Sequence, residues 1–477
     1  MTRVLVLSCD VVPLPGLPTV GGGLRSWTLA RGLETAGYDV TLSFPREPLE
    51  ALAGQVDAAA IAAAQPYTFN WSDPAAAVAA HQPEVVVCAS WLLASQFSTC
   101  PVPMAVDVAG PVLLEFLHQG KQKGLDLAAR KPQGLALADF VVCAGERQRA
   151  YFAAWLLIAG FTPQDCATRL ATMIMSAPPA PRPPHGPPNA EPVIIFAGVA
   201  LPWHDPLAPL KTVAETLERC GRGQLEIHLT QHPIHSQNAL WYGEFVTWAE
   251  AHPRVTIFPG TQRTHSAVLD LYRRADLAFD LFGHNLEREL AVANRTVEYL
   301  SCGLPVLHSS YSELAEPIGR YEAGVAVDPA DQQAVAAAIE QVLMAPETLR
   351  RWSENASRLT DELLTWDKTI APLAAWCAAP SRRQPGEFTP AMLLPDYERQ
   401  QELLQRLAGT EDELARAKTL AETRKEYAGQ VEAAWNAQGE QLAALDRDLA
   451  AWRAAPFRSA LRHTLSRPRS AERGTRN

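Results

Sequence analysis

The sequence lacks the features that define several large classes of protein. None of its eight cysteines belongs to a CxxC pair or shows the Cys/His spacing of a zinc site. No stretch reaches the roughly 18 consecutive apolar residues that a membrane-spanning helix needs. Basic residues are outnumbered, with 42 Lys and Arg against 52 Asp and Glu, and the net charge of −10 disfavours a general nucleic-acid-binding protein. We therefore expect a reduced, cytoplasmic protein without a metal site and without a nucleic-acid partner.

What the sequence does contain is a repeated alternation of short apolar runs with helix-length segments. The first series of strand-like runs lies at 4–8, 39–44, 84–90, 103–108 and 140–144. The second series lies at 193–198, 224–229, 254–258, 277–282, 303–309 and 324–328. Alternation of this kind predicts parallel sheets covered by helices on both faces.

A proline-rich stretch, 176–192, separates the two series. Proline has no amide donor for a helix or a sheet, so we interpret this stretch as a linker. We therefore predict an α/β fold of two Rossmann-like, doubly wound domains at 1–175 and 193–378, followed by a second linker at 379–398 and a helical extension.

The extension, at 399–455, has apolar residues at alternating four- and three-residue steps. They are Leu403, Leu407, Leu414, Ala417, Ala421, Ala428, Val431, Trp435, Leu442, Leu445, Leu449 and Trp452. This spacing predicts a coiled coil or a helical hairpin, through which the chain associates with itself or with a partner. Thr410, Arg424 and Gln438 interrupt the series, and Gly409, Gly429 and Gly439 weaken the helix.

The last segment, 456–477, is basic, with six arginines against one glutamate. Two interpretations stay open. The segment is either a disordered, solvated tail or a weak contact with an anionic membrane surface, where each basic residue contributes on the order of 1 kcal/mol. The second interpretation would make the protein peripheral to the inner face of a membrane.

A glycine-rich turn, Gly21-Gly22-Gly23, follows the first predicted strand and precedes a predicted helix. Glycines at the N-terminus of a helix let the backbone approach a phosphate, and the free amides and the helix dipole favour its negative charge. Triple glycine also occurs in ordinary flexible loops. The position of this turn at the carboxyl edge of a predicted parallel sheet favours a ligand-binding role.

The most specific pattern in the chain is NRTVEYLSCGLPV at 294–306. It resembles the donor-nucleotide motif of family 4 (group 1) glycosyltransferases of the GT-B fold, in which a glutamate on a helix precedes a small-residue-Cys-Gly-x-Pro turn. The resemblance implies that Glu298 binds the ribose of the donor, since a carboxylate can accept hydrogen bonds from both ribose hydroxyls. The alternative is a surface glutamate ahead of a purely structural turn. The resemblance extends over roughly 1–376 and does not include the helical extension.

The chain departs from the family pattern at a second glutamate, eight positions earlier, which contacts the donor sugar. Leu290 occupies that position here, and Glu289 is our first candidate to replace it, with Glu287 the second. On a helix, a shift of one residue rotates the side chain by about 100°.

A second departure concerns the Arg and Lys that neutralise the donor diphosphate in the family, which are missing from the loop after Gly198. Arg295, at the start of the predicted helix that carries Glu298, is our leading substitute, because charge on the departing diphosphate must be offset. Further candidates are Arg288, Arg263 and Lys211.

In the first domain, Asp107 ends a predicted strand in the region where the family often has a functional histidine. It is either a ligand of a sugar hydroxyl or a strand-end cap. Glu115 and Glu146 also lie at predicted carboxyl ends of elements and are candidates to line the cleft. Glu146 is equally suited to cap its own helix.

The resemblance implies a transferase that moves a sugar from a nucleotide-diphosphate sugar to a glycan, glycolipid or other acceptor, as in polysaccharide biosynthesis, with retention of configuration and no essential metal. The candidate catalytic residues are Glu289, Asp107 and Arg295, and the candidate donor-binding residues are Gly21, Gly22, Gly23, Gly198, Asn294, Arg295, Thr296 and Glu298. Two alternatives remain: a sugar-nucleotide epimerase of the same double-Rossmann build, and a catalytically degenerate transferase kept as an assembly scaffold.

Overall fold

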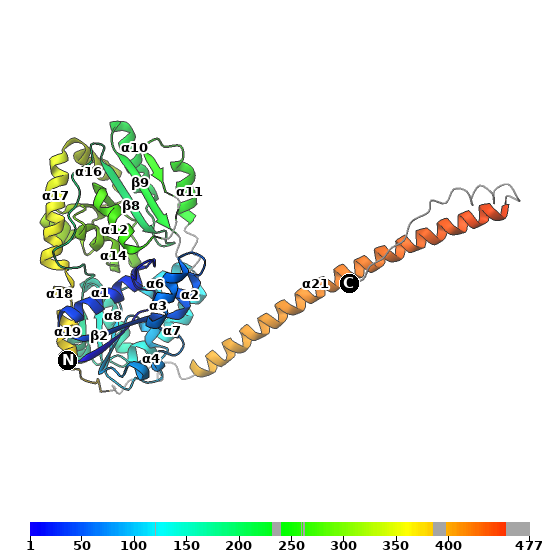
Figure 1. The fold of residues 1–477 in the computed structure, drawn as a ribbon, viewed down its shortest axis with the longest axis horizontal. Coiled ribbons are helices and arrows are strands. Elements are labelled where there is room, and N and C mark those ends of the chain that lie inside the picture. The colour runs from blue at the N-terminus through cyan, green and yellow to red at the C-terminus, as the bar shows by residue number, and fades with distance from the viewer. Residues whose placement is uncertain (120, 231–239, 259, 261–262, 385–396, 455–477) are drawn as a thin grey trace. The chain divides into compact units, whose positions relative to one another are not determined.

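The computed structural model describes residues 1–119, 121–230, 240–258, 260, 263–384 and 397–454 (Figure 1). The chain forms two compact units, Met1–Pro395 and Asp396–Asn477. The first unit contains two parallel sheets, which we call the first half and the second half.

The first half is built on a seven-stranded parallel sheet with the order β3-β2-β1-β4-β5-β6-β7. Its strands are β1 Arg3–Leu7, β2 Asp39–Pro45, β3 Thr68–Phe69, β4 Val85–Cys88, β5 Met104–Asp107, β6 Phe140–Cys143 and β7 Leu170–Thr172. Its helices are α1 Gly21–Thr35, α2 Arg46–Ala51, α3 Ala58–Ala64, α4 Pro74–His81, α5 Trp91–Ala94, α6 Val112–Gln119, α7 Lys121–Ala136, α8 Glu146–Ile158 and α9 Pro163–Arg169. Because the inner strands are covered on both faces, they are continuous apolar runs such as the fully buried VVVC of β4.

The second half has a six-stranded parallel sheet with the order β10-β9-β8-β11-β12-β13. Its strands are β8 Val193–Val199, β9 Gln224–Thr230, β10 Val255–Ile257, β11 Leu277–Asp280, β12 Val306–Ser309 and β13 Gly324–Val327. Its helices are α10 Leu207–Cys220, α11 Leu240–Ala249, α12 His265–Arg274, α13 Leu286–Leu290, α14 Asn294–Ser301, α15 Ala315–Tyr321, α16 Gln332–Met344 and α17 Pro346–Leu359. The predicted pair of doubly wound α/β domains is confirmed.

After α17 the chain returns to the first half. A π-helical segment, Thr360–Leu364, leads into α18 Trp366–Thr369 and α19 Ala371–Ala378. Figure 1 shows α18 and α19 beside α1 and β2, away from α16 and most of α17. The Trp376 ring stacks on Phe140 of β6 at 5.4 Å, and Ile370 packs in the same core. The stretch up to 378 that we assigned to the second domain therefore divides between the two halves.

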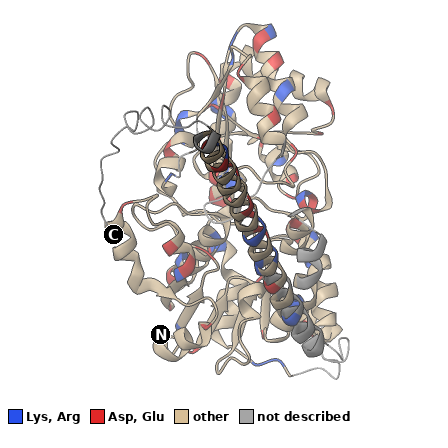
Figure 2. Cartoon of the chain, turned by 90° about the vertical axis from the view of Figure 1, so that its right-hand side faces the viewer, with Lys and Arg blue, Asp and Glu red and all other residues tan. Residues whose placement is uncertain are grey.

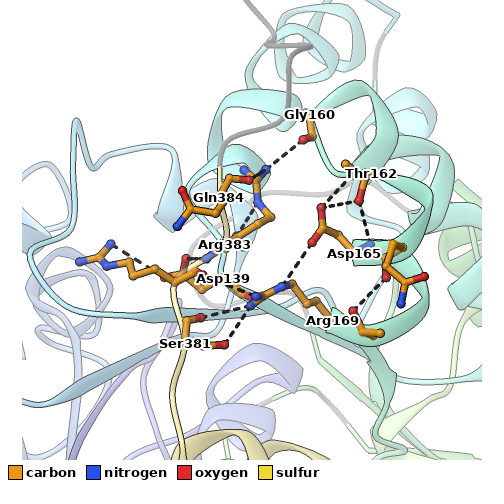
Figure 3. A network of polar contacts seen from close by, with 12 residues as sticks. Asp139, Gly160, Thr162, Asp165, Arg169, Ser381, Arg383 and Gln384 are labelled. Carbon is orange, nitrogen blue, oxygen red and sulfur yellow. Dashed lines mark hydrogen bonds and ion pairs between the residues drawn. The ribbon is translucent and has the colours of Figure 1, made fainter.

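The residues that follow α19 are fixed to the first half by arginine side chains (Figure 3). Arg383 donates hydrogen bonds to the carbonyls of Ala136 at 2.8 Å and Gly160 at 2.9 Å, and its own backbone amide donates to Asp139 at 2.7 Å. Arg169 donates to the carbonyl of Ser381 at 3.1 Å. The folded first unit therefore includes the residues up to Gln384.

The C-terminal unit contains one continuous helix, α21 Tyr397–Ala454, of 58 residues. The hairpin alternative is therefore wrong, since the three glycines do not break the helix. Acidic and basic residues are interspersed along it (Figure 2). Within the described residues, no helix is long and apolar enough to cross a bilayer. The basic segment 456–477 lies outside the described residues.

Candidate functional site

A cavity of about 880 Å³ lies between the first and second halves, at the carboxyl ends of strands from both sheets. This edge is where ligands bind in open parallel sheets. The residues that line the cavity include Asp10, Gly21, Gly22, Asp107 and Glu115 from the first half and Gly198, His204, Arg263, Glu287, Arg288, Asn294, Arg295 and Glu298 from the second.

The three glycines of the predicted turn form the first turn of α1. A Cβ on Gly22 would lie 2.7 Å from Sγ of Cys9, and a Cβ on Gly23 would overlap the carbonyl oxygen of Val11. The glycines are therefore needed so that the loop after β1 can pass close over the helix. Gly21 and Gly22 line the cavity, whereas Gly23 is buried under that loop.

Asn294 joins the two halves across the cavity. Its side-chain amide donates a 2.8 Å hydrogen bond to the carbonyl of Gly21. A Cβ on Gly21 would lie only 2.9 Å from the same amide nitrogen, so glycine is required for this approach. The contact brings the N-termini of α1 and α14 together, and the free amides and dipoles of both helices favour an anion at this place.

Glu298 lies one turn further along α14, four residues after Asn294 and therefore on the same face of the helix. Its side chain is 17% exposed, and one carboxylate oxygen lies 2.5 Å from Nε2 of His265, the first residue of α12. Burial opposes protonation of His265, but the hydrogen bond and charge of Glu298 outweigh burial and raise the pKa of the histidine. His265 is not among the site residues predicted from the sequence, because it is 33 residues from Glu298 and has no motif of its own.

Arg295 points toward the end of β8. Its guanidinium donates to the carbonyl of Ala197 at 3.4 Å and lies 3.3 Å from Nδ1 of His204. Gly198 has a φ of +131°, and a Cβ there would lie 3.3 Å from the guanidinium, so glycine allows this approach. Arg295 is thus a cation held against Gly198, near the end of β8, at the cavity wall.

Behind Arg295 lies a buried carboxylate, Asp280 at the end of β11. It accepts a 2.6 Å hydrogen bond from Thr296 and lies 2.9 Å from His308 and 4.0 Å from Arg295. Burial acts to raise the pKa of Asp280, yet these partners lower it overall. Thr296, which we expected at the donor, does not line the cavity and instead holds Asp280.

The structure distinguishes between the two candidate glutamates before Leu290. Glu287 lines the cavity, is buried, and pairs with Arg288 at 2.5 Å. Glu289 is 39% exposed, lies 3.0 Å from His284 and 3.8 Å from Arg147, and does not line the cavity. The preference for Glu289 is therefore corrected in favour of Glu287, because the short helix α13 turns Glu289 outward.

Two carboxyl groups of the first half face the same space. Burial and the nearby charge of Glu287 raise the pKa of Glu115 to about 8, against the opposing effect of Arg288. Burial raises the pKa of Asp10 to about 7, although the amide of Val11 donates to its carboxylate. Asp10 directly follows the first strand and its turn, a position that could have marked it as a candidate.

We expected Asp107 to be a candidate ligand of a sugar hydroxyl, but its carboxylate is not available to a ligand. It is fully buried and receives two hydrogen bonds from Arg25 of α1, at 2.9 and 3.0 Å. Arg25 also donates to the carbonyls of Met173 and Ile174. The pair therefore joins α1, β5 and the two residues that follow β7, and its role is structural.

The remaining basic candidates also divide between the cavity and the surface. Arg263 lines the cavity, whereas Lys211 pairs with Glu244 at 3.2 Å outside it. Glu146 does not cap its own helix, because Glu313 of the second half accepts hydrogen bonds from the amides of Glu146 and Arg147 at 2.7 and 3.2 Å.

Comparison with known proteins finds a family model that matches part of the second half. Residues 248–359 match the family model described as glycosyl transferases group 1, a segment that contains α12, α13 and α14. No curated protein matches the sequence.

Several solved structures have a similar fold. Sucrose-phosphate synthase from Thermosynechococcus elongatus superposes with a TM-score of 0.56 at 17% identity, covering 79% of this chain and 98% of its own. Trehalose-6-phosphate synthase superposes with a TM-score of 0.58 at 10% identity, covering 80% and 100%. The UDP-forming α,α-trehalose-phosphate synthase from Burkholderia vietnamiensis gives 0.54 at 12% identity, covering 80% and 98%. At these identities the likeness establishes the GT-B fold.

Proposed function

We propose that the protein is a glycosyltransferase that takes a sugar from a nucleotide-diphosphate sugar, because residues 248–359 match the group 1 glycosyl transferase family model and the chain has a GT-B fold. We further propose that the acceptor is a hydroxyl of a glycan or glycolipid, that the anomeric configuration is retained, and that the charge of the diphosphate is met by protein groups without a metal. A surface polysaccharide or glycolipid product is part of the same proposal.

The observation that supports this function best is the arrangement along α14. Asn294 and Arg295 lie at its N-terminus and Glu298 lies one turn later, all lining one cavity. One helical turn rises about 5.4 Å. A nucleoside diphosphate presents ribose hydroxyls and a diphosphate in this order, so Glu298 suits the ribose while the helix N-terminus and Arg295 suit the diphosphate.

His265 gives this arrangement a second component. Its hydrogen bond to Glu298 orients the carboxylate in the absence of a donor. Ribose hydroxyls that bind Glu298 must share this carboxylate with His265 or displace it.

Transfer requires that the negative charge on the departing nucleotide diphosphate is stabilised. Arg295 and the N-termini of α1 and α14 supply positive potential at the place that we assign to the diphosphate. Arg288 contributes less, because Glu287 already neutralises it at 2.5 Å. Preorganised groups of this kind act in a site from which water is excluded.

Nothing in the described part of the cavity stands out as a protein nucleophile for a covalent step. Asp10 and Glu115, whose raised pKa values make them partly protonated near neutral pH, lie on the acceptor side instead. We assign them to hydrogen bonds with acceptor or sugar hydroxyls.

The test is calorimetric titration of the full chain with UDP, GDP and ADP sugars, together with slow hydrolysis of each donor. Glu298→Ala should weaken binding of the preferred donor by about 1–3 kcal/mol, as expected for lost charge-assisted hydrogen bonds. Glu289→Ala, the matched control outside the cavity, should leave binding unchanged.

The same experiment distinguishes the alternatives. Binding of no donor would leave only the scaffold, and turnover of a donor without any acceptor or hydrolysis would indicate an epimerase. Unchanged affinity in Glu298→Ala would refute the assignment of the ribose to this carboxylate.

A further inference from the structure

Helix α21 has an apolar face that no other described residue of its own unit covers. Leu414 is 54% exposed, Trp435 76%, and Leu442 and Leu445 65% each. Single exposed apolar residues are normal, but a continuous row of large ones marks a surface for interaction.

The row repeats every seven residues. From Leu414 to Leu449 the steps are three and four in strict alternation, with Arg424 and Gln438 the polar members of the series. A straight helix drifts by about 20° per heptad relative to such a repeat, so the row stays on one face only if the helix supercoils around another helix. The partner that this face fits is therefore a helix with a matching repeat.

We propose that the partner is a second copy of this chain, and that the two α21 helices pair antiparallel with Arg424 of each facing Trp435 of the other. In this register Leu414 lies opposite Leu445, and Ala417 lies opposite Leu442. The neighbouring layers place Ala421 opposite Gln438 and Ala428 opposite Val431. Ala417, Ala421 and Ala428 each meet a larger residue, so no layer consists of two small residues, which favours close packing.

The parallel arrangement is much poorer, because every residue then faces itself. Two Arg424 guanidinium groups would share one desolvated layer, and two Trp435 rings would crowd another. Ala417, Ala421 and Ala428 would each face alanine and leave their layers underfilled. In the antiparallel register the guanidinium of Arg424 lies on an indole face instead, which is a favourable cation–π contact.

Charges beside the apolar row do not reverse this preference. The antiparallel register brings Lys425 near Glu432 of the second copy, but it also brings Glu413 near Asp448. The parallel arrangement would pair Glu413 with Lys418. Exposed pairs of this kind contribute little and are screened by salt, so the buried layers decide the orientation.

The mass of the full chain in solution tests the pairing. Light scattering at tens of micromolar should give twice the 52.0 kDa of one chain. Leu442→Asp/Leu445→Asp should halve the measured mass. The matched control, Ala437→Asp/Ala444→Asp, adds the same charge on the outer face of α21 and should stay dimeric. A wild-type protein that remains at the mass of one chain would overturn the proposal.

Cross-linking tests the orientation, in a Cys220→Ser background because Cys220 is an exposed free cysteine. Under mild oxidation, chains with Leu414→Cys alone should not cross-link, and neither should chains with Leu445→Cys alone. A mixture of the two variants should give a covalent dimer. A cross-linked dimer from Leu414→Cys alone would show parallel helices and overturn the antiparallel arrangement.

Discussion

The two halves contribute to the cavity in contrasting ways. The second half supplies Glu287, Asn294, Arg295 and Glu298 from one stretch of twelve residues. The first half supplies Asp10, Gly21, Gly22 and Glu115 from loops and helix starts spread over more than a hundred residues. A site concentrated in one segment can be recognised as a motif, whereas a dispersed one exists only after the sheet has formed.

The halves also use buried charge differently. Arg25 and Asp107 of the first half neutralise each other and hold elements together. In the second half Arg295 and Glu298 lie at the cavity wall, where a ligand can meet them. The buried pair of the first half thus satisfies itself, whereas these two residues of the second half lie where the proposed donor would meet them.

The largest effect should come from breaking the buried pair of the first half. Asp107→Ala leaves the guanidinium of Arg25 buried without its partner, which should lower the free energy of unfolding by about 3–5 kcal/mol. Urea unfolding measures this loss. The double variant Arg25→Met/Asp107→Leu should recover most of it, and a single variant as stable as wild type would show that the pair is dispensable.

Lys131 of the first half is another buried ionisable side chain, but it has no carboxylate partner among the described residues. It lies against the rings of Tyr151 and Trp155, both at 4.4 Å, and burial lowers its pKa to about 6. An unfolded lysine titrates near about 10.4. Between these two pKa values the unfolded chain binds more protons than the folded one. The free energy of unfolding of the wild type should therefore rise with pH from about 6 to about 10.4.

Lys131→Met should consequently stabilise the protein at pH 7, by on the order of 1–4 kcal/mol. The gain should shrink as the pH approaches that of free lysine. Urea unfolding of both proteins at pH 7 and pH 10 checks this. A gain that is independent of pH would contradict the proton-linked explanation.

In the second half, the pair of His265 and Glu298 should give a smaller pH dependence of the opposite sign. The pKa of His265 is raised above its ordinary value of 6.5, so the pair stabilises the fold fully below that value. This contribution should disappear as the pH rises through the folded pKa of the histidine. Because both side chains are partly exposed, the effect should stay below about 1 kcal/mol.

Comparing the unfolding of wild type and His265→Gln at pH 6 and pH 9 measures this contribution. The difference between the two proteins should be larger at pH 6. Equal differences at both pH values would show that the pair does not titrate in this range.

The smallest effect should come from Glu289. Its partners, His284 and Arg147, are exposed, so Glu289→Gln should change the free energy of unfolding by less than about 0.5 kcal/mol. Glu287→Gln, two residues away, should cost clearly more because Arg288 is buried beside it. Similar losses in the two variants would contradict the placement of Glu287 inside the cavity.

Much of the fold could be predicted, because valine-rich runs alternate with helix-length segments and a proline-rich stretch divides them. Glu298 could be found because its helix and turn lie within thirteen residues of sequence. The choice between Glu287 and Glu289 could not be made, because it depends on how α13 is rotated. Asn285 sets that rotation by capping α13 and by donating to the carbonyl of Trp203, 82 residues away.

The same reason explains the other misses. His265 meets Glu298 across 33 residues, and Arg25 meets Asp107 across 82. Neither distance leaves a repeating pattern in the sequence. Hydrophobic periodicity predicts which elements form, but a pairing between two polar side chains depends on the finished topology.

The chain passes between the halves twice, and the two passages touch. The amide of Ala177 in the first passage donates to the carbonyl of Leu364 in the second at 2.8 Å, and the amide of Trp366 donates back to Ala177 at 3.0 Å. Because the two connections are hydrogen-bonded to each other at one point, we expect the halves to move by rotation about that point and not by sliding past each other. Admission of a donor would then require this rotation to part Asn294 from Gly21, and departure of the spent nucleotide would require the same bond to open again.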